Sequence, residues 1–475
     1  MALTVPLAEI VERSSNRLLG KHESWGRVLL GDIATVLNGF AFKSSEFSNS
    51  GGVPLIRIRD VGKDRSETTY LGEYDPRYVV EPGDLLVGMD GDFNCARWRG
   101  PRGLLNQRVC KITLKSDIYL PKFLDYTLPG YLKAINDVTS SVTVKHLSSK
   151  SIEEIPLPLP PIEVQQRLVA EIEKQFSRLD EAVANLKRVK ANLKRFKASV
   201  LKAAVEGKLT EDWRKAHPNV EPASKLLERI LAERRVKWRG RGKYKEPAQP
   251  ETNIIGPLPD PWMLASIDQL SSLVTDGDHN PPKRVPEGVP HLTAKHIKGW
   301  RISFEDCSYI SLLDYERTRS RFEPQPGDFI VTCVGTVGQT AIVPAGITFS
   351  ADRNLAGIRL VECGMTPKFL QIVLNSPDWQ LRMRQASGST AQPHLYLGDL
   401  RTLQIPLPPL PEQETIIEEV ERRLSVIEEL EAAVQANLTR ANRLRQSILQ
   451  RAFNGDLLSG DVISSNERTA YESRC

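Results

Sequence analysis

The chain has 475 residues, 40% of them apolar, so it is long enough for about three domains with real hydrophobic cores. No stretch approaches the roughly eighteen apolar residues of a membrane span, and no basic region followed by an apolar run marks a signal peptide, so we expect an intracellular protein. The formal charge of +5 permits a nucleic-acid partner without requiring one, and the six cysteines, without a Cys-x-x-Cys pair, argue against a zinc site or a disulfide framework.

Residues 1–24 form a polar N-terminal segment, and residues 25–157 have the pattern of a mixed α/β domain. Short apolar runs such as Val53-Pro-Leu-Ile alternate there with clusters of Gly, Asn and Asp, as strands and turns do. Residues 119–136 are expected to form a helix. We therefore predict a single α/β domain ahead of the first long helix.

Apolar residues recur with a seven-residue period in residues 158–207 and again in residues 404–455, which keeps one side of a helix facing a partner helix. Proline runs from Pro156 to Pro161 and from Pro406 to Pro411 mark the helix starts, and Gly207 and Gly455 end the helices. The predicted apolar seam consists of Leu168, Ile172, Leu179, Leu186, Leu193, Val200, Ile416, Val420, Ile427, Val434 and Ile448. A second row, also expected to face the partner, contains Gln175, Ala182, Val189, Phe196, Arg423, Leu430, Asn437 and Leu444.

Residues 208–260 are predicted to be a linker with a short helix over 224–235 and a basic run over 234–245, for which a solvated, mobile linker is the favoured interpretation. Residues 261–403 repeat the α/β pattern, since Pro367-Lys-Phe-Leu repeats Pro121-Lys-Phe-Leu and Trp262 matches Trp25. Residues 404–455 form the second long helix and residues 456–475 a C-terminal tail. The whole half of the chain is therefore duplicated.

The duplication is clearest in the helices, where residues 160–210 align without a gap with residues 408–458 at an offset of 248 and are identical at fourteen of fifty-one positions. Both helices begin acidic and end basic: residues 187–202 hold seven basic residues and no acidic one. Antiparallel pairing sets opposite charges side by side, and the sum of such pairs, each worth about 0.2–1 kcal/mol, favours that orientation. The predicted fold is thus two mixed α/β (α+β) domains duplicated in tandem, each followed by a long helix, with the helices in an antiparallel coiled coil of pseudo-two-fold symmetry. Ordinary amphipathic helices in separate cores remain the alternative.

The sequence contains no pattern of residues that would support catalysis. There is no Gly-x-x-x-x-Gly-Lys-Ser/Thr loop for a nucleoside triphosphate. Asn280-Pro-Pro-Lys283 resembles the base-holding element of adenine methyltransferases, but Lys283 stands where a stacking aromatic is needed, so a turn is the better interpretation. His279, His291 and His296 lack a carboxylate or Cys at ligand spacing, so we expect no metal site.

Polar loops in both α/β domains carry the side chains that bind DNA. Arg, Asn and Gln make paired hydrogen bonds to guanine or adenine in the major groove, and Lys mostly contacts phosphate. The candidates are Lys43, Arg57, Arg59, Arg97, Arg99, Arg102, Asn106, Gln107, Arg108, Lys145 and His146 in the first domain, and His279, Asn280, Lys283, Arg284, Lys295, His296, Gln339, Arg353, Asn354, Gln392 and His394 in the second. For any single residue a structural role is the stronger interpretation. The hypothesis depends on recurrence, since Asn106-Gln-Arg108 matches Asp352-Arg-Asn354 at an offset of 246.

The chain resembles the specificity (S, HsdS) subunits of type I restriction-modification systems over essentially its whole length. The resemblance is carried by Ile155-Pro-Leu-Pro-Leu-Pro-Pro with Gln165, by Ile405-Pro-Leu-Pro-Pro-Leu-Pro-Glu-Gln413, by the helix ends that start at Ser199 and Ser447, and by Gly103-Leu-Leu-Asn-Gln-Arg-Val. It implies two target-recognition domains that each recognise one half of a split double-stranded DNA sequence. It also implies two DNA adenine methyltransferase subunits and restriction (translocase) subunits as partners, with S-adenosylmethionine, ATP and Mg²⁺ bound by those partners and no cofactor bound by this chain.

Two alternatives to this interpretation stay open. One is a non-enzymatic scaffold whose coiled coil binds only protein, and the other is a catalytic methyltransferase or nuclease, which the missing motifs argue against. Sequence-selective, salt-dependent DNA binding separates the first alternative from the specificity-subunit interpretation, because phosphate contacts make affinity fall steeply with salt.

Overall fold

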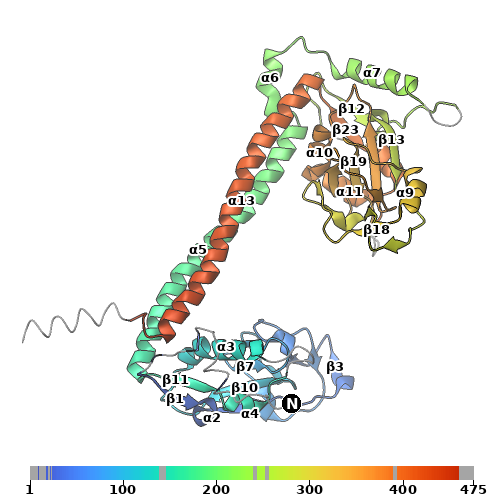
Figure 1. Ribbon diagram of the computed structural model, residues 1–475. Helices are drawn as coiled ribbons and strands as arrows, with labels where there is room; N and C mark the ends of the chain where they lie inside the picture. The colour runs from blue at the N-terminus through green and yellow to red at the C-terminus, as the bar shows by residue number, and fades with distance from the viewer. Residues whose placement is uncertain are drawn as a thin grey trace, which may run out of the picture. The chain divides into compact units, whose positions relative to one another are not determined.

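The structure is a computed structural model that describes residues 9, 18–19, 22, 24–138, 146–238, 243–251, 256–388 and 393–458. The chain divides into two compact units. Unit 1 comprises residues Met1–Lys187 and Gln435–Cys475, and unit 2 comprises Arg188–Val434. Each unit therefore combines one α/β region with a part of both long helices, which are labelled α5 and α13 in Figure 1.

Unit 1 holds short strands, short helices and the first turns of α5. The strands are β1 (Gly26–Leu29), β2 (Ala34–Asn38), β3 (Phe47–Ser48), β4 (Val53–Ile56), β5 (Thr69–Tyr70), β6 (Val79–Val80), β7 (Leu85–Gly88), β8 (Cys95–Arg97), β9 (Gly103–Leu105), β10 (Val109–Leu114) and β11 (Pro156–Leu159). The helices are α2 (Leu30–Ile33), η1 (Ser44–Glu46), η2 (Ile58–Asp60), η3 (Pro76–Tyr78), α3 (Pro121–Val138), α4 (Ser149–Glu153) and α5 (Ile162–Val205), which continues into unit 2.

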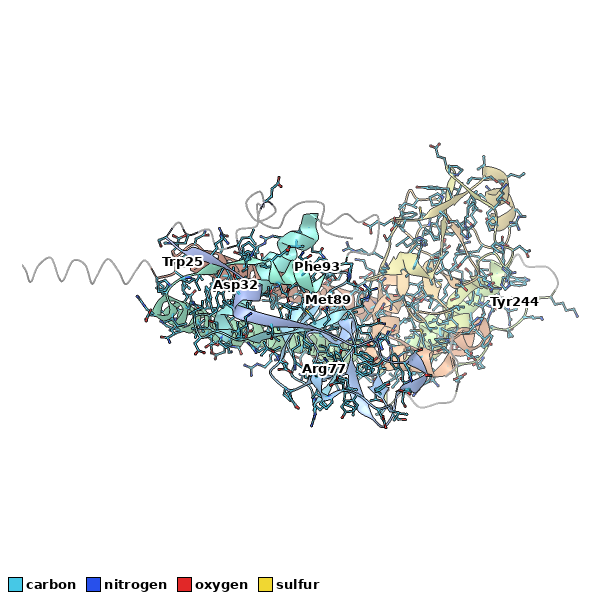
Figure 2. All side chains as sticks on the ribbon, turned by 90° about the horizontal axis from the view of Figure 1, so that it is seen from below. Trp25, Asp32, Arg77, Met89, Phe93 and Tyr244 are labelled. Carbon is cyan, nitrogen blue, oxygen red and sulfur yellow. The ribbon has the colours of Figure 1, made fainter. Side chains whose placement is uncertain are left out.

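Three sheets build the α/β region of unit 1, in the orders β2-β10-β7-β8, β3-β5-β4-β9-β6 and β1-β11. Strand β10 is central because its apolar side chains are buried between two partners, and Ile112 pairs with Val36 on one side and Leu85 on the other. Met89 and Phe93, labelled in Figure 2, belong to the main core. That core also takes in the start of α5 and the end of α13, so the domain and both helix segments share one buried apolar surface.

Unit 2 has the same kinds of element. Its strands are β12 (Met263–Ser266), β13 (Ser271–Asp276), β14 (Arg284–Val285), β15 (Val289–Leu292), β16 (Ile297–Lys298), β17 (Arg301–Ile302), β18 (Ser308–Ile310), β19 (Phe329–Thr332), β20 (Thr340–Ile342), β21 (Ser350–Ala351), β22 (Leu355–Leu360) and β23 (Gln404–Leu407). Its helices are η4 (Lys208–Thr210), α6 (Glu211–Ala216), α7 (Ala223–Val236), α8 (Ile267–Leu270), η5 (Ala294–His296), α9 (Leu312–Arg319), α10 (Pro367–Asn375), α11 (Pro377–Ala386), α12 (Leu397–Thr402) and α13 (Leu410–Phe453), which continues into unit 1.

The sheets of unit 2 have strand orders that correspond to those of unit 1. The order β13-β22-β19-β20 corresponds to β2-β10-β7-β8, and β12-β23 corresponds to β1-β11. In the third sheet, β14-β18-β15-β21, the parallel pair β15–β21 corresponds to the parallel pair β4–β9. Strands β16 and β17 form an added hairpin with no counterpart among the described residues of unit 1. Both α/β regions are therefore mixed α/β structures of like topology.

The two long helices are each 44 residues long. Except for Pro411, the second residue of α13, the prolines of these runs lie before the helices: Pro156–Leu159 is strand β11, paired with β1, and Gln404–Leu407 is strand β23, paired with β12. Proline lacks an N–H donor and tolerates such edge positions, and each of these sheets has only two strands. The helices accordingly start four to six residues later than the predicted starts at 158 and 404.

One predicted row of apolar residues is buried on each helix and the second is not. Nine of the eleven seam residues are buried, and the other two, Leu179 and Leu186, are half-buried. In the second row Val189, Phe196, Leu430 and Leu444 are 44–52% exposed. The expectation that both rows face a partner helix is therefore wrong for these four positions. A single partner helix can bury only a narrow row of side chains. Where the apolar surface of a helix is wider than that row, the remaining apolar side chains stay exposed.

Two residues of the basic run, Arg234 and Arg235 at the end of α7, have partners that a solvated linker would not provide, while residues 239–242 of the run lie outside the described residues. Arg234 Nε donates to the carbonyl of Ser271 at 2.9 Å, and its Nη1 donates to the Tyr244 hydroxyl at 2.9 Å. The guanidinium of Arg235 lies over the same Tyr244 ring, at 5.3 Å from its centroid, and pairs with Glu246. The Tyr244 ring and backbone carbonyl oxygens thus bind guanidinium groups that the run of positive charges had suggested would be solvated.

Candidate nucleic-acid interface

A cluster of three polar side chains, Asp90, Arg108 and His146, lies at the surface of unit 1. Nδ1 of His146 lies 2.6 Å from one carboxylate oxygen of Asp90, and Nε of Arg108 lies 3.5 Å from the other. Nη1 of Arg108 is 3.1 Å from the same histidine nitrogen. Asp90 therefore holds a guanidinium and an imidazole beside each other, and both side chains are partly exposed to solvent.

The backbone around this cluster fixes the turn between β9 and β10. Arg108 has a φ of 70°, in the left-handed region, where a non-glycine residue is uncommon. Asn106, two residues earlier, is buried and forms a parallel β-bridge with Phe40, while Gln107 is exposed. Gly39 passes so close that a Cβ there would lie 2.0 Å from the Asn106 carbonyl oxygen, so only glycine fits. The turn thus presents Gln107 and Arg108 outward from a fixed base.

The matching turn of unit 2, Asp352-Arg-Asn354, is anchored by equivalent backbone bridges, although Arg108 has a positive φ and Asn354 does not. A parallel bridge joins Asp278 to Asp352, as one joins Phe40 to Asn106, and an antiparallel bridge joins Val334 to His394, as one joins Asp90 to His146. A Cβ on Gly277 would lie 2.1 Å from the backbone of residue 351. The bridges and the close glycine are thus common to both units, but the side chains differ.

The side chains on this second turn have other partners than those of unit 1. Asn354 donates from Nδ2 to Asp352 at 2.9 Å, while Arg353 is exposed. His394 stacks on Tyr396 with ring centroids 4.3 Å apart, and the tyrosine is 61% exposed. Burial raises the pKa of Asp352 against the opposing hydrogen bonds from Asn354. The two turns therefore offer different donors and acceptors at equivalent places.

A second polar group in unit 2 surrounds Asp276 and Asp278. Nη2 of Arg317 lies 3.3 Å from Asp278, and His279 Nε2 lies 2.7 Å from Asp276, which Arg321 also pairs with. Burial tends to raise the pKa of Asp276, but hydrogen bonds from Arg321 and His279 outweigh it and leave that pKa below its ordinary value. Asp276 is therefore an anion that orients two exposed cationic or polar groups.

Several other predicted contacts have structural partners. Arg97 donates to Asp125 at 2.7 Å and to the Gly83 carbonyl at 2.7 Å, Arg59 donates to Thr68 at 3.0 Å, and Arg102 pairs with Glu81 at 3.3 Å. His296 is 2% exposed and accepts at Nδ1 from the Thr293 backbone, so this residue is a helix cap and not a surface group. Burial of Asn106 and His296 removes both from the surface that a duplex can contact.

The remaining candidates lie as follows. Lys43, Arg99, Lys283, Arg284, Asn280 and Lys295 are exposed, Arg57 and Gln339 are half-buried, and Lys145 and Gln392 lie outside the described residues. The backbone N–H of Asn280 donates to Asp278 at 3.2 Å, as the turn interpretation of that segment predicts. The structure thus brings Arg108 and His146 together in unit 1, and places His279 with Arg321, which was not among the candidates, in unit 2.

Sequence reasoning missed Asp90, Arg317, Arg321 and Tyr396. Asp90 has Val334 at the matching bridge position, so the duplication gives no signal for it. Arg317 lies on α9 and Arg321 just after it, in a segment whose charges look like those of any solvated helix. Of these four residues, only Tyr396 had a signal in the sequence, because it is an aromatic residue beside a polar loop, two residues after the candidate His394.

Among the residues that the structure describes, no group of three or more His, Cys, Asp or Glu side chains could hold a metal ion. The five cysteines of that part of the chain are free thiols. No described helix has the length and apolar character needed to cross a membrane. The chemistry at the two turns is therefore that of hydrogen-bond donors and acceptors, which suits recognition of base edges and phosphates.

Two like α/β regions with different polar turns, attached to long helices, define a modular recognition protein. The family model described as type I restriction modification DNA specificity domain matches residues 22–195 and 280–440, most of the chain. The chain belongs to this family. As a member, it is a DNA-recognition subunit of a type I restriction-modification system and not an enzyme.

Known relatives agree over nearly the full length. The chain is 37% identical over 456 residues to the type I restriction enzyme EcoBI specificity subunit of Escherichia coli, with 94% of this chain and 90% of the relative covered. It is 23% identical to the EcoKI specificity subunit of Escherichia coli strain K12, with 92% and 89% covered. A solved chain from a study of complex assembly and conformational transition of the type I R-M system matches with a TM-score of 0.59 at 19% identity, over 91% of this chain and 98% of that one, and supports the fold.

Proposed function

We propose that this chain recognises a bipartite, asymmetric double-stranded DNA target, with residues 25–157 and residues 261–403 each recognising one half. The observation that carries the proposal is the pair of surface turns, which are anchored by equivalent backbone bridges but carry different side chains. Arg108 in one corresponds to Asn354 in the other. Arginine pairs with guanine and asparagine with adenine in the major groove, so two such turns suit two different half-sites.

Internal duplication supports this interpretation. The helices repeat at an offset of 248, and the sheets of the two units have corresponding strand orders. We infer that a tandem duplication produced two scaffolds whose loops then diverged. Since loops placed on a rigid scaffold commonly carry recognition, divergence there changes the half-site without changing the fold.

The long helices suit an antiparallel coiled coil with pseudo-two-fold symmetry. In unit 1, Arg445 of α13 pairs with Asp180 of α5 and lies over the Phe176 ring, so the basic end of one helix meets the acidic start of the other. In unit 2, Glu412 near the start of α13 is fully buried and accepts from Arg214 and Thr210, which follow the end of α5. Both sets of contacts fit the charge pattern of the sequence.

The exposed second row of the helices suits a partner protein. Phe196 and Leu444 occupy equivalent positions at the offset of 248 and are 52% and 49% exposed. A repeated apolar surface binds two copies of one partner, which we infer to be DNA adenine methyltransferase subunits, joined by restriction subunits in the full complex. S-adenosylmethionine, ATP and Mg²⁺ then belong to those partners, and the assembly works in the cytoplasm of a prokaryotic cell.

A map of methylated adenines tests the proposal. In cells that express this chain with its methyltransferase subunit, we expect one two-part motif with a fixed gap, which disappears without this chain. Arg108→Ala should relax base preference at one position of one half-site, since a good bidentate pair gives about 1–3 kcal/mol of discrimination. Arg77→Ala, an exposed arginine of the same unit that pairs with Asp75 away from the turn, is the control. A continuous motif, or a change in both halves with Arg108→Ala, contradicts the proposal.

A further inference from the structure

A fully buried glutamine lies near the start of α5 and joins the helix to its α/β region. The Oε1 atom of Gln165 accepts a hydrogen bond from the backbone N–H of Leu120 at 2.9 Å. Its Nε2 donates to the carbonyls of Ile118 and Pro160, each at 2.9 Å. One amide thus satisfies both its donors and its acceptor on two separate loops, those before α3 and before α5.

The same arrangement occurs in unit 2 with Gln413, which is also fully buried. Its Oε1 accepts from the backbone N–H of Thr366 at 3.0 Å, and its Nε2 donates to the Pro408 carbonyl at 3.1 Å. Thr366 precedes α10 as Leu120 precedes α3, so the bonds join equivalent elements. Most helix positions have diverged between the two copies, but this glutamine has not, and two of its bonds recur: one from the backbone N–H that precedes the domain helix and one to the proline carbonyl that precedes the long helix.

An ion pair lies at a second point of the same joint. Lys122 on α3 pairs with Glu173 on α5 at 3.0 Å, and Lys368 on α10 pairs with Glu421 on α13 at 2.6 Å. Both pairs are exposed and add little stability. They lie eight residues after each glutamine along the helix, and two separated points of attachment fix an angle where one point would act as a pivot.

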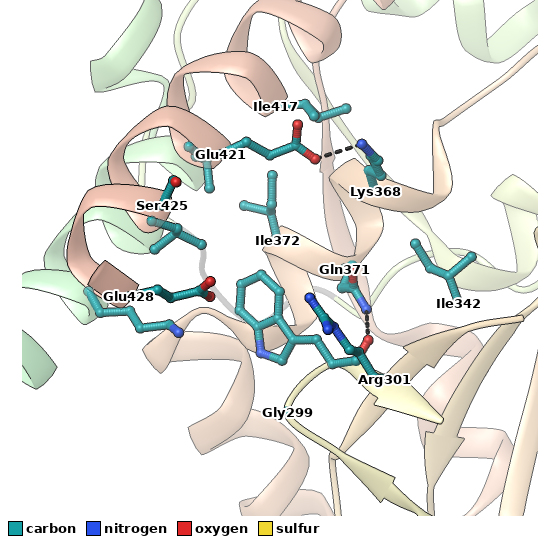
Figure 3. A pocket seen from close by; sticks show the side chains of 14 residues that line it. Gly299, Arg301, Ile342, Lys368, Gln371, Ile372, Ile417, Glu421, Ser425 and Glu428 are labelled. Carbon is teal, nitrogen blue, oxygen red and sulfur yellow. Dashed lines mark hydrogen bonds and ion pairs between the residues drawn. The ribbon is translucent and has the colours of Figure 1, made fainter. Parts of the chain in front are cut away.

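A cation over an aromatic ring is the third contact. Arg445 lies 4.4 Å from the Phe176 ring centroid in unit 1, and Lys197, its equivalent at the offset of 248, lies 5.5 Å from the Trp300 ring in unit 2. Figure 3 shows the joint of unit 2, where Gln371 of α10 donates to the Trp300 carbonyl at 3.1 Å beside the Lys368–Glu421 pair. The chemistry of the contact recurs although the rings come from different elements.

We propose that Gln165 and Gln413 are positioning residues that fix the angle between each recognition domain and its helices, and thereby the gap between the two half-sites. The inference rests on the proposed function. A rotation of about 10° at a joint moves a point about 20 Å away by roughly 3.5 Å, close to the ~3.4 Å rise per base pair. A loosened joint therefore admits gaps one base pair longer or shorter, while the surface turns and their half-sites stay the same.

The test compares gap lengths in methylation maps of cells that express the full chain with its methyltransferase subunit. Wild type should use one gap length. Gln165→Ala and Gln413→Ala should each raise methylation at gaps one base pair longer or shorter by at least about tenfold relative to wild type, with unchanged half-site sequences. Gln175→Ala is the matched control, because this glutamine bonds only along its own helix, to Glu171 at 2.9 Å.

Surface variants cover the case in which the buried substitutions prevent folding. Lys122→Glu should widen the range of gap lengths. Lys122→Glu combined with Glu173→Lys should restore a single gap length, since both side chains are exposed and tolerate exchange. A single gap length in every accumulating variant overturns the inference, whatever happens to overall activity. If wild type itself shows no two-part motif, the proposed function is wrong. If wild type shows the motif and the variants keep its gap length, only the positioning role of the glutamines is wrong.

Discussion

His291 is a fully buried histidine on β15 whose Nδ1 lies 3.2 Å from the Ser350 hydroxyl. Burial, and next the nearby Arg284 guanidinium, lower the pKa of His291 from 6.5 to about 4. Between these pH values the unfolded chain binds a proton that the folded chain does not. The free energy of unfolding is therefore highest above about pH 6.5 and decreases as the pH falls from there toward about 4. At about pH 5.5 unit 2 should be roughly 1.3 kcal/mol less stable than at about pH 7.5 from this residue alone.

Thermal unfolding at the two pH values checks this prediction. His291→Asn, which keeps a polar atom toward Ser350, should remove most of the pH-dependent part of the loss. Gln325→Asn, at an exposed position of the same unit whose side chain does not titrate, should leave the loss as it is. An equal pH response in wild type and His291→Asn would show that His291 is not the group that titrates.

At the residue scale, residue types and the internal repeat predict which side chains could contact DNA, but not which residues those side chains contact within the fold. The Asn-Gln-Arg turn is predictable because a matching turn follows at an offset of 246. Arg97 and Arg108 look alike in sequence, yet Arg97 is held by Asp125 inside the domain and Arg108 stands at the surface. The difference depends on contacts between residues far apart in the chain, which composition and spacing do not encode.

At the element scale, the seven-residue period of α13 separates two kinds of apolar residue. Ile427 is 1% exposed and Leu430, on the second row, is 48% exposed. Ile427→Ala should lower the free energy of unfolding by about 2–5 kcal/mol, because it removes packed methyl groups and leaves a cavity. Leu430→Ala should change stability by less than about 0.5 kcal/mol.

Denaturant unfolding of the two variants measures this difference, and titration with the methyltransferase subunit adds a second reading. Leu430→Ala should weaken that association if the second row is the partner surface. A large loss of stability in Leu430→Ala would place its side chain against the chain itself. Unchanged association would remove this position from the proposed docking surface.

Long helices were predictable because their period extends over many turns, and short strands were not. The run Pro156–Leu159 forms a strand only because β1, about 130 residues earlier, supplies its partner, and a two-residue strand such as β5 has no pattern of its own. The expected helices at 119–136 and 224–235 are present as α3 and α7, within one or two residues at each end.

At the scale of the whole molecule, both long helices begin in one unit and end in the other. A continuous helix of 44 residues is about 65 Å long. We propose that this length sets the gap between the two half-sites. The glutamine joints bear on the same gap through an angle. Length and angle are separable, because an insertion changes the first and leaves both joints intact.

Inserting four residues at matching depths, after Lys187 in α5 and after Gln435 in α13, lengthens each helix by about one turn, or ~6 Å. One turn is the smallest insertion that leaves the buried row facing nearly its original direction, within about 40°. Because each base pair adds ~3.4 Å, the methylated motif should keep both half-sites and gain one or two base pairs between them. Insertion of four residues after Glu246, outside both helices, should leave the gap unchanged. Retention of the original gap in the helix insertion would show that something other than helix length sets the distance, and the methylation map decides between the two.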